Sequence, residues 1–143
     1  MMGMRATDII KRDHTAVKDL FQQFKSAEEE DRDELCEKII DALETHETME
    51  DTYFYPALKE SGKDKGMVEG MEREQKKLAE ELGGIKDMDE GRNDGLEKFM
   101  NKVLAHAQKE EREILPMAER ILGAAKLEEL GEAMKPESAA ANA

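Results

Sequence analysis

Two short motifs with the same spacing combine side chains that bind metal ions. His46 is followed four residues later by Glu50, and the same spacing separates His106 from Glu110. On a helix, residues four positions apart lie about one turn apart on the same face, so each pair can direct an imidazole and a carboxylate at one point. Imidazole and carboxylate together suit iron, manganese or zinc. The two motifs therefore predict a metal site, and His14, the third histidine of the chain, is a further candidate ligand.

All three histidines interrupt stripes of apolar residues. Ile10 and Val17 flank His14 at helical spacing, and Leu43 and Val103 stand three residues before the other two histidines. A stripe of this kind is normally buried, and burying an ionised carboxylate without a partner is very unfavourable. Bound metal ions would compensate the two glutamates. A metal-free helical interaction domain would leave these carboxylates unexplained.

The two motifs belong to a longer internal repeat. In residues 46–56 and 106–116, an acidic residue follows each motif glutamate, and a proline stands ten residues after each histidine. The preceding apolar stripes also match, and their alignment places Gln75 opposite His14. The symmetry predicts a ligand at position 75, where this chain has glutamine, a poor metal ligand.

Four amphipathic segments can position these residues. Apolar residues recur in each segment at steps of three and four, which is typical of helices packed in a left-handed bundle. We expect helices from Thr7 to about Ala27, from the acidic stretch 28–33 to about Pro56, over 71–85 and over 96–117. Long helices joined by short loops predict an all-α, antiparallel up-down-up-down four-helix bundle. We assign residues 5–125 to this bundle, and residues 126–143 to a short C-terminal helix and a disordered tail.

The composition excludes several other classes of protein. The net charge of −13 disfavours nucleic acid as a partner, because an acidic surface repels phosphate groups. No apolar run approaches the roughly 20 residues that cross a membrane, and the first ten residues lack the apolar stretch of a secretory signal. We therefore expect a cytoplasmic protein that does not bind membranes. The single cysteine, Cys36, excludes an internal disulfide and a multi-cysteine metal site.

The motifs and their surroundings resemble the hemerythrin HHE cation-binding domain family. The resemblance covers roughly residues 5–125 and includes the segments 55–58 and 115–116 that follow the two motifs. It implies a four-helix bundle that holds two iron ions, a non-haem di-iron centre bridged by carboxylates and by an oxo or hydroxo oxygen atom.

The resemblance also implies a role for each candidate ligand. The histidines would be terminal ligands and the motif glutamates would bridge the two ions: His14, His46 and His106, with Glu50 and Glu110. Family members usually have histidine where this chain has Gln75. That position is filled by the amide oxygen of Gln75, by the neighbouring Glu74, or by water in an open coordination position.

The implied function is a reaction with, or sensing of, a small oxidant such as oxygen, peroxide or nitric oxide. Oxygen carriers of the family are richer in histidine, and the carboxylates of this site favour ferric iron. Reversible oxygen binding for transport is therefore disfavoured, whereas a peroxide-consuming or oxidase-type activity stays open. The alternative is an iron-binding or iron-sensing module whose metal-dependent fold is read by a protein partner.

Two further polar residues fall on the predicted stripes, one layer beyond the site. Tyr53 stands seven residues after His46, and Glu113 stands seven residues after His106. Tyr53 is then either a core residue hydrogen-bonded to Glu113 or a residue that adjusts the metal centre from outside the ligand set.

Overall fold

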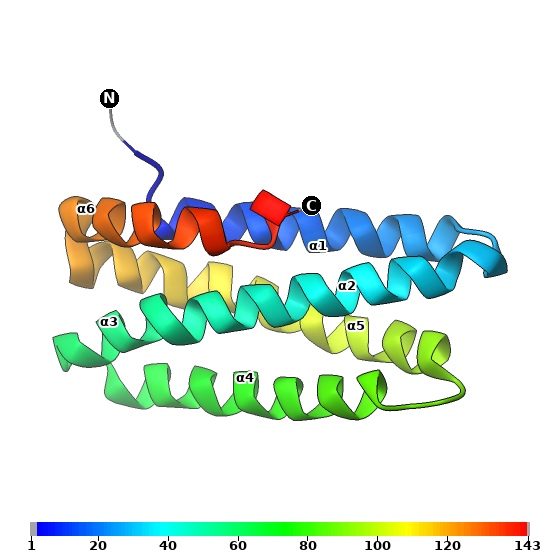
Figure 1. Cartoon of the computed structure of the whole chain (residues 1–143). Coiled ribbons are helices and arrows are strands. Elements are labelled where there is room, and N and C mark those ends of the chain that lie inside the picture. The colour runs from blue at the N-terminus through cyan, green and yellow to red at the C-terminus, as the bar shows by residue number, and fades with distance from the viewer. Residues whose placement is uncertain (1–2, 143) are drawn as a thin grey trace.

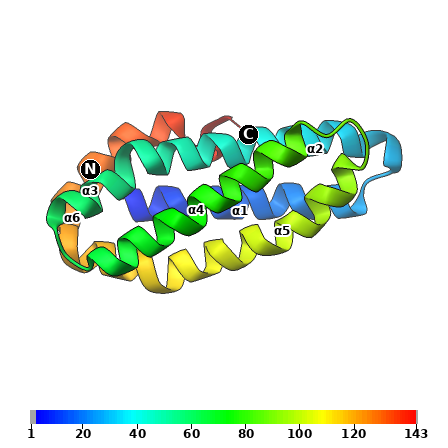
Figure 2. The same cartoon turned by 90° about the horizontal axis from the view of Figure 1, so that it is seen from below.

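The computed structural model describes residues 3–142, and over this range every regular element is helical. Helices run antiparallel along one long axis, with their connections at the two ends of the molecule (Figures 1 and 2). The predicted all-α four-helix bundle is confirmed. The long helices are α1 (Ala6–Ser26), α2 (Glu29–Met49) with its continuation α3 (Tyr55–Ser61), α4 (Lys65–Lys86), and α5 (Arg92–Lys109) with its continuation α6 (Leu115–Met134).

The second and fourth long helices of the bundle, α2 with α3 and α5 with α6, each contain one π-helical turn. These turns, η1 (Glu50–Phe54) and η2 (Glu110–Ile114), begin at the two motif glutamates. The backbone N–H of Tyr55 donates to the carbonyl of Glu50, five residues earlier, and Leu115 donates to Glu110 in the same way. A proline follows each turn and offers no N–H to the ordinary helical pattern. The internal repeat in the sequence is therefore also a repeat in the backbone.

Each π turn changes which side chains face the interior. A π turn inserts one extra residue, so the positions after it are rotated relative to a regular α-helix. Phe54 and Tyr55 are buried, whereas Tyr53 is half-buried and hydrogen-bonds to Glu137. Glu113 is exposed. The prediction that Tyr53 and Glu113 follow the inner stripe is wrong, because steps of three and four do not continue through a π turn.

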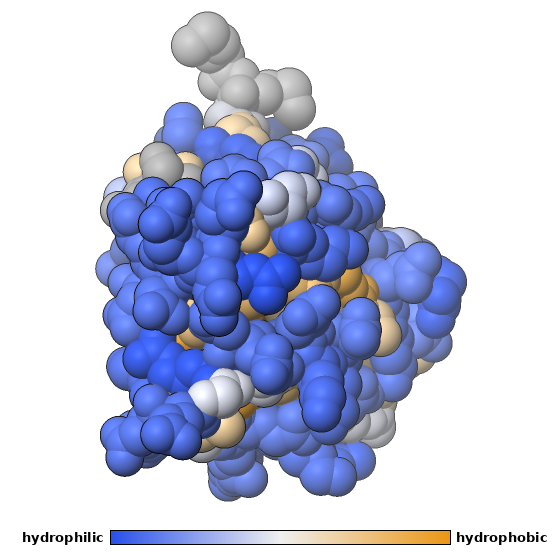
Figure 3. Space-filling view, turned by 90° about the vertical axis from the view of Figure 1, so that its right-hand side faces the viewer, coloured by the Kyte–Doolittle hydropathy of each residue, from blue (hydrophilic) through white to orange (hydrophobic). Residues whose placement is uncertain are grey.

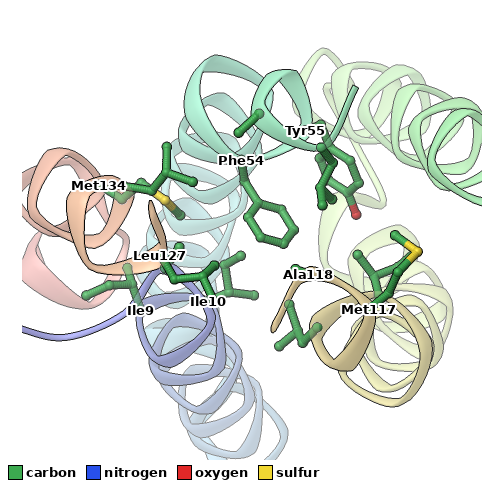
Figure 4. Close-up of a cluster of buried hydrophobic side chains, with 14 of the residues drawn as sticks. Ile9, Ile10, Phe54, Tyr55, Met117, Ala118, Leu127 and Met134 are labelled. Atoms are coloured by element: carbon green, nitrogen blue, oxygen red, sulfur yellow. The ribbon is translucent and has the colours of Figure 1, made fainter. Parts of the chain in front are cut away.

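Two apolar clusters fill the bundle on either side of the motif residues. One cluster combines Ile9 and Ile10 of α1 with Phe54 and with Leu127 and Met134 of α6 (Figure 4). The other contains residues from the opposite end of the bundle, including the fully buried Cys36: Val17, Phe21, Phe24, Cys36, Ile39, Ile40, Leu43, Leu82, Leu96, Phe99 and Met100. Asp13, His46, Gln75 and Glu110 are buried polar residues that lie between these clusters in the helix sequences. The outer surface is strongly hydrophilic, as the end of the bundle in Figure 3 shows.

Within α6, the chain bends at Gly123 and folds back on the bundle. Gly123 has a φ of 78° and a ψ of 166°, which interrupts α6 and turns its second part against α1. Gly131 then packs so close to the Met4 carbonyl that a Cβ atom there would overlap it. We expect a disordered tail over 136–143. Residue 143 lies outside the described residues, and the described part of this range contains most of two 3₁₀ turns, η3 (Lys135–Glu137) and η4 (Ala140–Asn142). Ser138 between them is buried, so this segment is packed against the bundle.

Among residues 3–142, no helix is both long enough and apolar enough to cross a bilayer.

Candidate metal centre

Four of the predicted ligands converge in the middle of the bundle. His14 comes from α1, His46 from α2, Glu50 from η1 and Glu110 from η2. One ligand atom from each of them lies within 4.8 Å of the others. Nε2 of His14 is 3.0 Å from Oε1 of Glu110, and Nε2 of His46 is 3.2 Å from Oε1 of Glu50. Two imidazoles and two carboxylates therefore face one point, from four segments that are far apart in the sequence.

Other carboxylates fix the orientation of these two imidazole rings. Nδ1 of His46 is 2.8 Å from Oδ2 of Asp13, and Nδ1 of His14 is 2.7 Å from Oε2 of Glu111. A carboxylate accepts hydrogen bonds, so each Nδ1 donates a proton to its partner. Nε2 of each ring faces the buried glutamates and is the nitrogen that a metal ion would bind, in place of any proton there.

His106 and Gln75 form a second group next to the first. Nε2 of His106 is 3.4 Å from Oε1 of Gln75, and the amide nitrogen of Gln75 donates to Oδ1 of Asp51 at 3.0 Å. Because the Asp51 carboxylate is an acceptor, it holds the amide with its oxygen toward His106. Gln75 is only 3% exposed. The amide oxygen of Gln75 is therefore presented to the interior on the same side as His106 Nε2.

Glu74, the other candidate on α4, lies on the outer side of His106. Its Oε1 is 3.5 Å from Nδ1 of His106, and its Oε2 accepts a 2.6 Å hydrogen bond from Lys109. The Lys109 hydrogen bond lowers the pKa of Glu74. The side chain is 43% exposed. In this arrangement Glu74 contacts the nitrogen of His106 that faces away from Gln75.

The two buried glutamates are poorly compensated by protein groups alone. Oε2 of Glu50 and Oε1 of Glu110 are buried and accept no hydrogen bond from residues 3–142. Burial and the nearby Glu110 carboxylate raise the pKa of Glu50. Burial also acts to raise the pKa of Glu110, but the imidazole of His14, whose Nε2 is 3.0 Å from Oε1, outweighs it, and the pKa is lowered. Cations between these carboxylates would keep both ionised and satisfy the unpaired oxygens, so the residues present fit a metal centre.

A small cavity opens beside the converging ligands. Its volume is about 40 Å³, and apolar side chains such as Leu78, Val103 and Leu104 form much of its wall. A single water molecule needs roughly 10–15 Å³ measured in this way. The cavity therefore has room for a molecule of two or three heavy atoms and excludes larger organic compounds.

Sequence reasoning gave no role to Asp13, Glu111 and Asp51, which orient residues of the site, and it missed two further residues that touch the site. Tyr55 is fully buried and donates a 2.6 Å hydrogen bond to Oε2 of Glu110, and only the π turn brings it there. Glu47 lines the cavity, and burial raises its pKa to about 7. Leu43 stands four residues before Glu47, so the apolar stripe of α2 contained a signal for this residue.

Comparisons with known proteins agree with this geometry. The chain matches the family model of the hemerythrin HHE cation-binding domain over residues 5–118. Uncharacterized proteins of Mycobacterium tuberculosis and Mycobacterium bovis are each 32% identical to it over 138 residues, which cover 92% of this chain and 83% of each relative. No protein of solved structure matches the chain.

Proposed function

The chain belongs to the hemerythrin HHE cation-binding domain family, and from this premise we propose that it is a non-haem di-iron protein that reacts with a small oxidant. Membership makes it a hemerythrin-like, metal-binding protein, and its buried histidine and glutamate cluster could hold a metal ion. The identity of the metal, the number of ions and the oxidant are the proposed part.

The observation that carries the proposal is the convergence of two imidazoles on two buried, incompletely hydrogen-bonded carboxylates. His14 and His46 would hold one ion, and His106 with the amide oxygen of Gln75 would hold the other. Glu50 and Glu110 would serve both ions. This donor set of nitrogen and hard oxygen atoms suits iron, and the two carboxylates favour its ferric state. In its reduced, ferrous state, a bound iron pair would supply the electrons that an oxidant accepts, and the carboxylates would stabilise the ferric product.

The protein around the site restricts what can react there. The cavity of about 40 Å³ is lined by the proposed ligands, so the bound ions would share it, and the remaining space would suit only small molecules such as oxygen, peroxide or nitric oxide. Tyr55 holds the carboxylate of Glu110 in place through its hydroxyl group. The three histidines are fewer than an oxygen carrier of this family uses, which supports consumption or sensing of the oxidant over its transport.

Elemental analysis tests the metal part of the proposal. Protein expressed in iron-rich medium should contain close to two metal ions per chain, mainly iron, and should absorb in the near ultraviolet through charge transfer from its ligands to iron. A Glu50→Ala, Glu110→Ala double variant, prepared in the same way, is the control and should contain almost none. A wild-type protein that is fully stable and free of metal would refute the proposal.

Mixing the iron-loaded protein with hydrogen peroxide tests the reaction. We expect peroxide consumption that depends on bound iron and is absent from the double variant. If the loaded protein leaves peroxide, oxygen and nitric oxide unchanged, the alternative of an iron-sensing module read by a partner replaces the reactive function. Binding of a protein partner that depends on metal would then be the property to measure.

A further inference from the structure

The segment after α6 reaches the residue that orients His46. Beyond the bend at Gly123, Leu127 and Met134 are fully buried in the apolar cluster that also contains Ile9 and Ile10 (Figure 4). The chain then continues through η3 and η4 and lies along α1 (Figure 1). This segment, residues 135–142, lies beyond the end of the family match at residue 118.

Main-chain groups of this segment bind the carboxylate of Asp13. The N–H of Ala139 donates to Oδ2 at 3.0 Å, and the N–H of Ala140 donates to Oδ1 at 2.9 Å. Oδ2 also accepts the 2.8 Å hydrogen bond from Nδ1 of His46. Asp13 is fully buried, so these three donors surround a carboxylate that has no access to solvent.

Side-chain contacts hold the segment in this position. Arg12, next to Asp13 on α1, donates from Nη2 to the hydroxyl of Ser138 at 3.1 Å. The same hydroxyl donates to the carbonyl of Lys135 and accepts the N–H of Ala141. Ser138 thus connects the turn to α1 on one side and closes the turn on the other.

We propose that residues 135–142 form a C-terminal clamp that holds Asp13 as a positioning residue for His46 and thereby sets the imidazole tautomer that binds metal. The proposal rests on the proposed function for the role of His46. Two main-chain donors keep the Asp13 carboxylate in one orientation, with Oδ2 toward His46. The Nδ1 proton of the imidazole is then held by Asp13, and Nε2, which faces Glu50, is the nitrogen left for a metal ion.

The other converging histidine has a different arrangement. His14 is oriented by Glu111 of η2, within the bundle and within the family match, and the Glu111 side chain is 40% exposed. Of these two carboxylate–histidine pairs, only Asp13–His46 accepts hydrogen bonds from main-chain N–H groups of the C-terminal clamp. Binding free energies are reciprocal, so docking of the clamp should strengthen metal binding, and bound metal should keep the clamp docked.

A pair of proline substitutions in the full-length protein tests the proposal. Ala140→Pro removes one N–H donor to Asp13, at the first residue of a 3₁₀ turn, where proline is tolerated. Ala141→Pro removes an N–H that donates to the Ser138 hydroxyl but leaves both donors to Asp13, and it is the comparison variant. Measured by competition of iron(II) with a chelator, Ala140→Pro should weaken binding of one ion roughly tenfold, the lower end of the effects of such partners. Ala141→Pro loses a contact of the turn but no donor to Asp13, so it should weaken binding less than Ala140→Pro does. Equal losses in both variants, or no loss in Ala140→Pro, would overturn the proposal.

A double variant separates positioning from packing. In Asp13→Asn, an NH₂ group replaces one carboxylate oxygen, and an NH₂ group cannot accept a hydrogen bond. At the Oδ1 position the NH₂ would face one donor, the N–H of Ala140. At the Oδ2 position it would face two donors, the N–H of Ala139 and Nδ1 of His46. The amide should therefore face the N–H of Ala140, and Ala140→Pro removes that conflict. The double variant should lose less affinity than the sum of the two single losses. Strict additivity would show that the two groups do not act on each other.

A spectroscopic measurement keeps the clamp testable if no iron binds. In ¹⁵N-resolved spectra of the metal-free wild-type protein, the Nδ1–H of His46 should show the hydrogen bond to Asp13 and should exchange slowly with solvent, as should the amides of Ala139 and Ala140. In Ala140→Pro the Nδ1 proton of His46 should exchange faster. An unchanged Nδ1–H in that variant would refute the clamp whatever the metal content, whereas absent iron with the expected Nδ1–H would refute only the proposed function.

Discussion

At the scale of single residues, His14 and His46 each depend on a carboxylate that is not itself directed at the centre. Asp13 and Glu111 bind Nδ1 of His46 and His14, and Glu74 lies near Nδ1 of His106. A neutral imidazole binds metal through one nitrogen only, so the partner of the other nitrogen decides whether the ring is competent. The site is therefore built from at least two layers of polar residues.

The buried glutamates should matter more for metal content than the glutamine. A carboxylate that serves both ions contributes to two sites, whereas Gln75 contributes to one at most. We expect Glu50→Ala or Glu110→Ala to lose most of the metal and Gln75→Ala to lose no more than roughly half. Elemental analysis of the purified variants measures this, with the exposed Glu113→Ala as a control of unchanged content. Equal losses from all three substitutions would mean that the roles are assigned wrongly.

Gln75→His should change affinity and reactivity in opposite directions. An imidazole binds iron far better than a neutral amide, so metal affinity should rise. If the glutamine keeps a coordination position accessible to the oxidant, the same change should slow peroxide consumption. Chelator competition and peroxide assays on one preparation measure both effects. A variant that gains affinity and reactivity together would contradict the open position, and one unchanged in both would mean that position 75 does not contact the ions.

At the scale of elements, the π turns decide which tyrosine contacts the ligands of the site. Both turns start at a motif glutamate and end before a proline, so the glutamates and the residues that follow them are presented differently from those of a regular helix. In η1 this brings Tyr55 to Glu110 and leaves Tyr53 with Glu137 near the surface. π turns are often found at functional sites. One turn begins at each motif glutamate, so the two halves of the internal repeat contribute to the centre in the same way.

Two matched tyrosine substitutions test this effect of the π turn. Tyr55→Phe removes the buried hydrogen bond to Glu110 and should lower the free energy of unfolding by about 1–3 kcal/mol. Tyr53→Phe removes a hydrogen bond near the surface and should change it by less than about 0.5 kcal/mol. Urea denaturation of both variants gives the two values. A larger loss in Tyr53→Phe would indicate that the regular helical spacing continues through residues 50–54.

At the scale of the whole molecule, a polar layer separates two apolar clusters. The clusters supply the hydrophobic stabilisation of the bundle, and the layer between them contains the buried Glu50 and Glu110, which are costly without cations. The fold is thus arranged so that the bound ions would contribute to its stability. The acidic surface surrounds this interior with charges of one prevailing sign.

Removal of metal should therefore lower the melting temperature. A ligand present at 100 times its dissociation constant stabilises the folded state by about 2.7 kcal/mol. For a domain of this size, that corresponds to a fall in Tm of roughly 5–10 °C when a chelator removes the ions. Calorimetry with and without chelator measures it. The Glu50→Ala, Glu110→Ala double variant should show no chelator effect, and a wild-type Tm independent of chelator would contradict a structural role for the metal.

The sequence by itself determined the bundle and the convergence of its main polar residues. Helical spacing is a local property, so the stripes around His46 and His106 predicted both the helices and the direction of each histidine–glutamate pair. The internal repeat correctly placed Gln75, the counterpart of His14, in the interior. These inferences needed only the geometry of a single helix and the cost of burying charge.

The tertiary structure alone decided the features that join different segments. The π turns arise from hydrogen bonds between residues five apart, which side-chain spacing does not encode, and so Tyr55 took the place expected for Tyr53. The carboxylates that orient His14 and His46 come from other helices. The alanine-rich segment 139–141 carries no side-chain signal, because its contribution at Asp13 is made by backbone N–H groups that every residue except proline possesses.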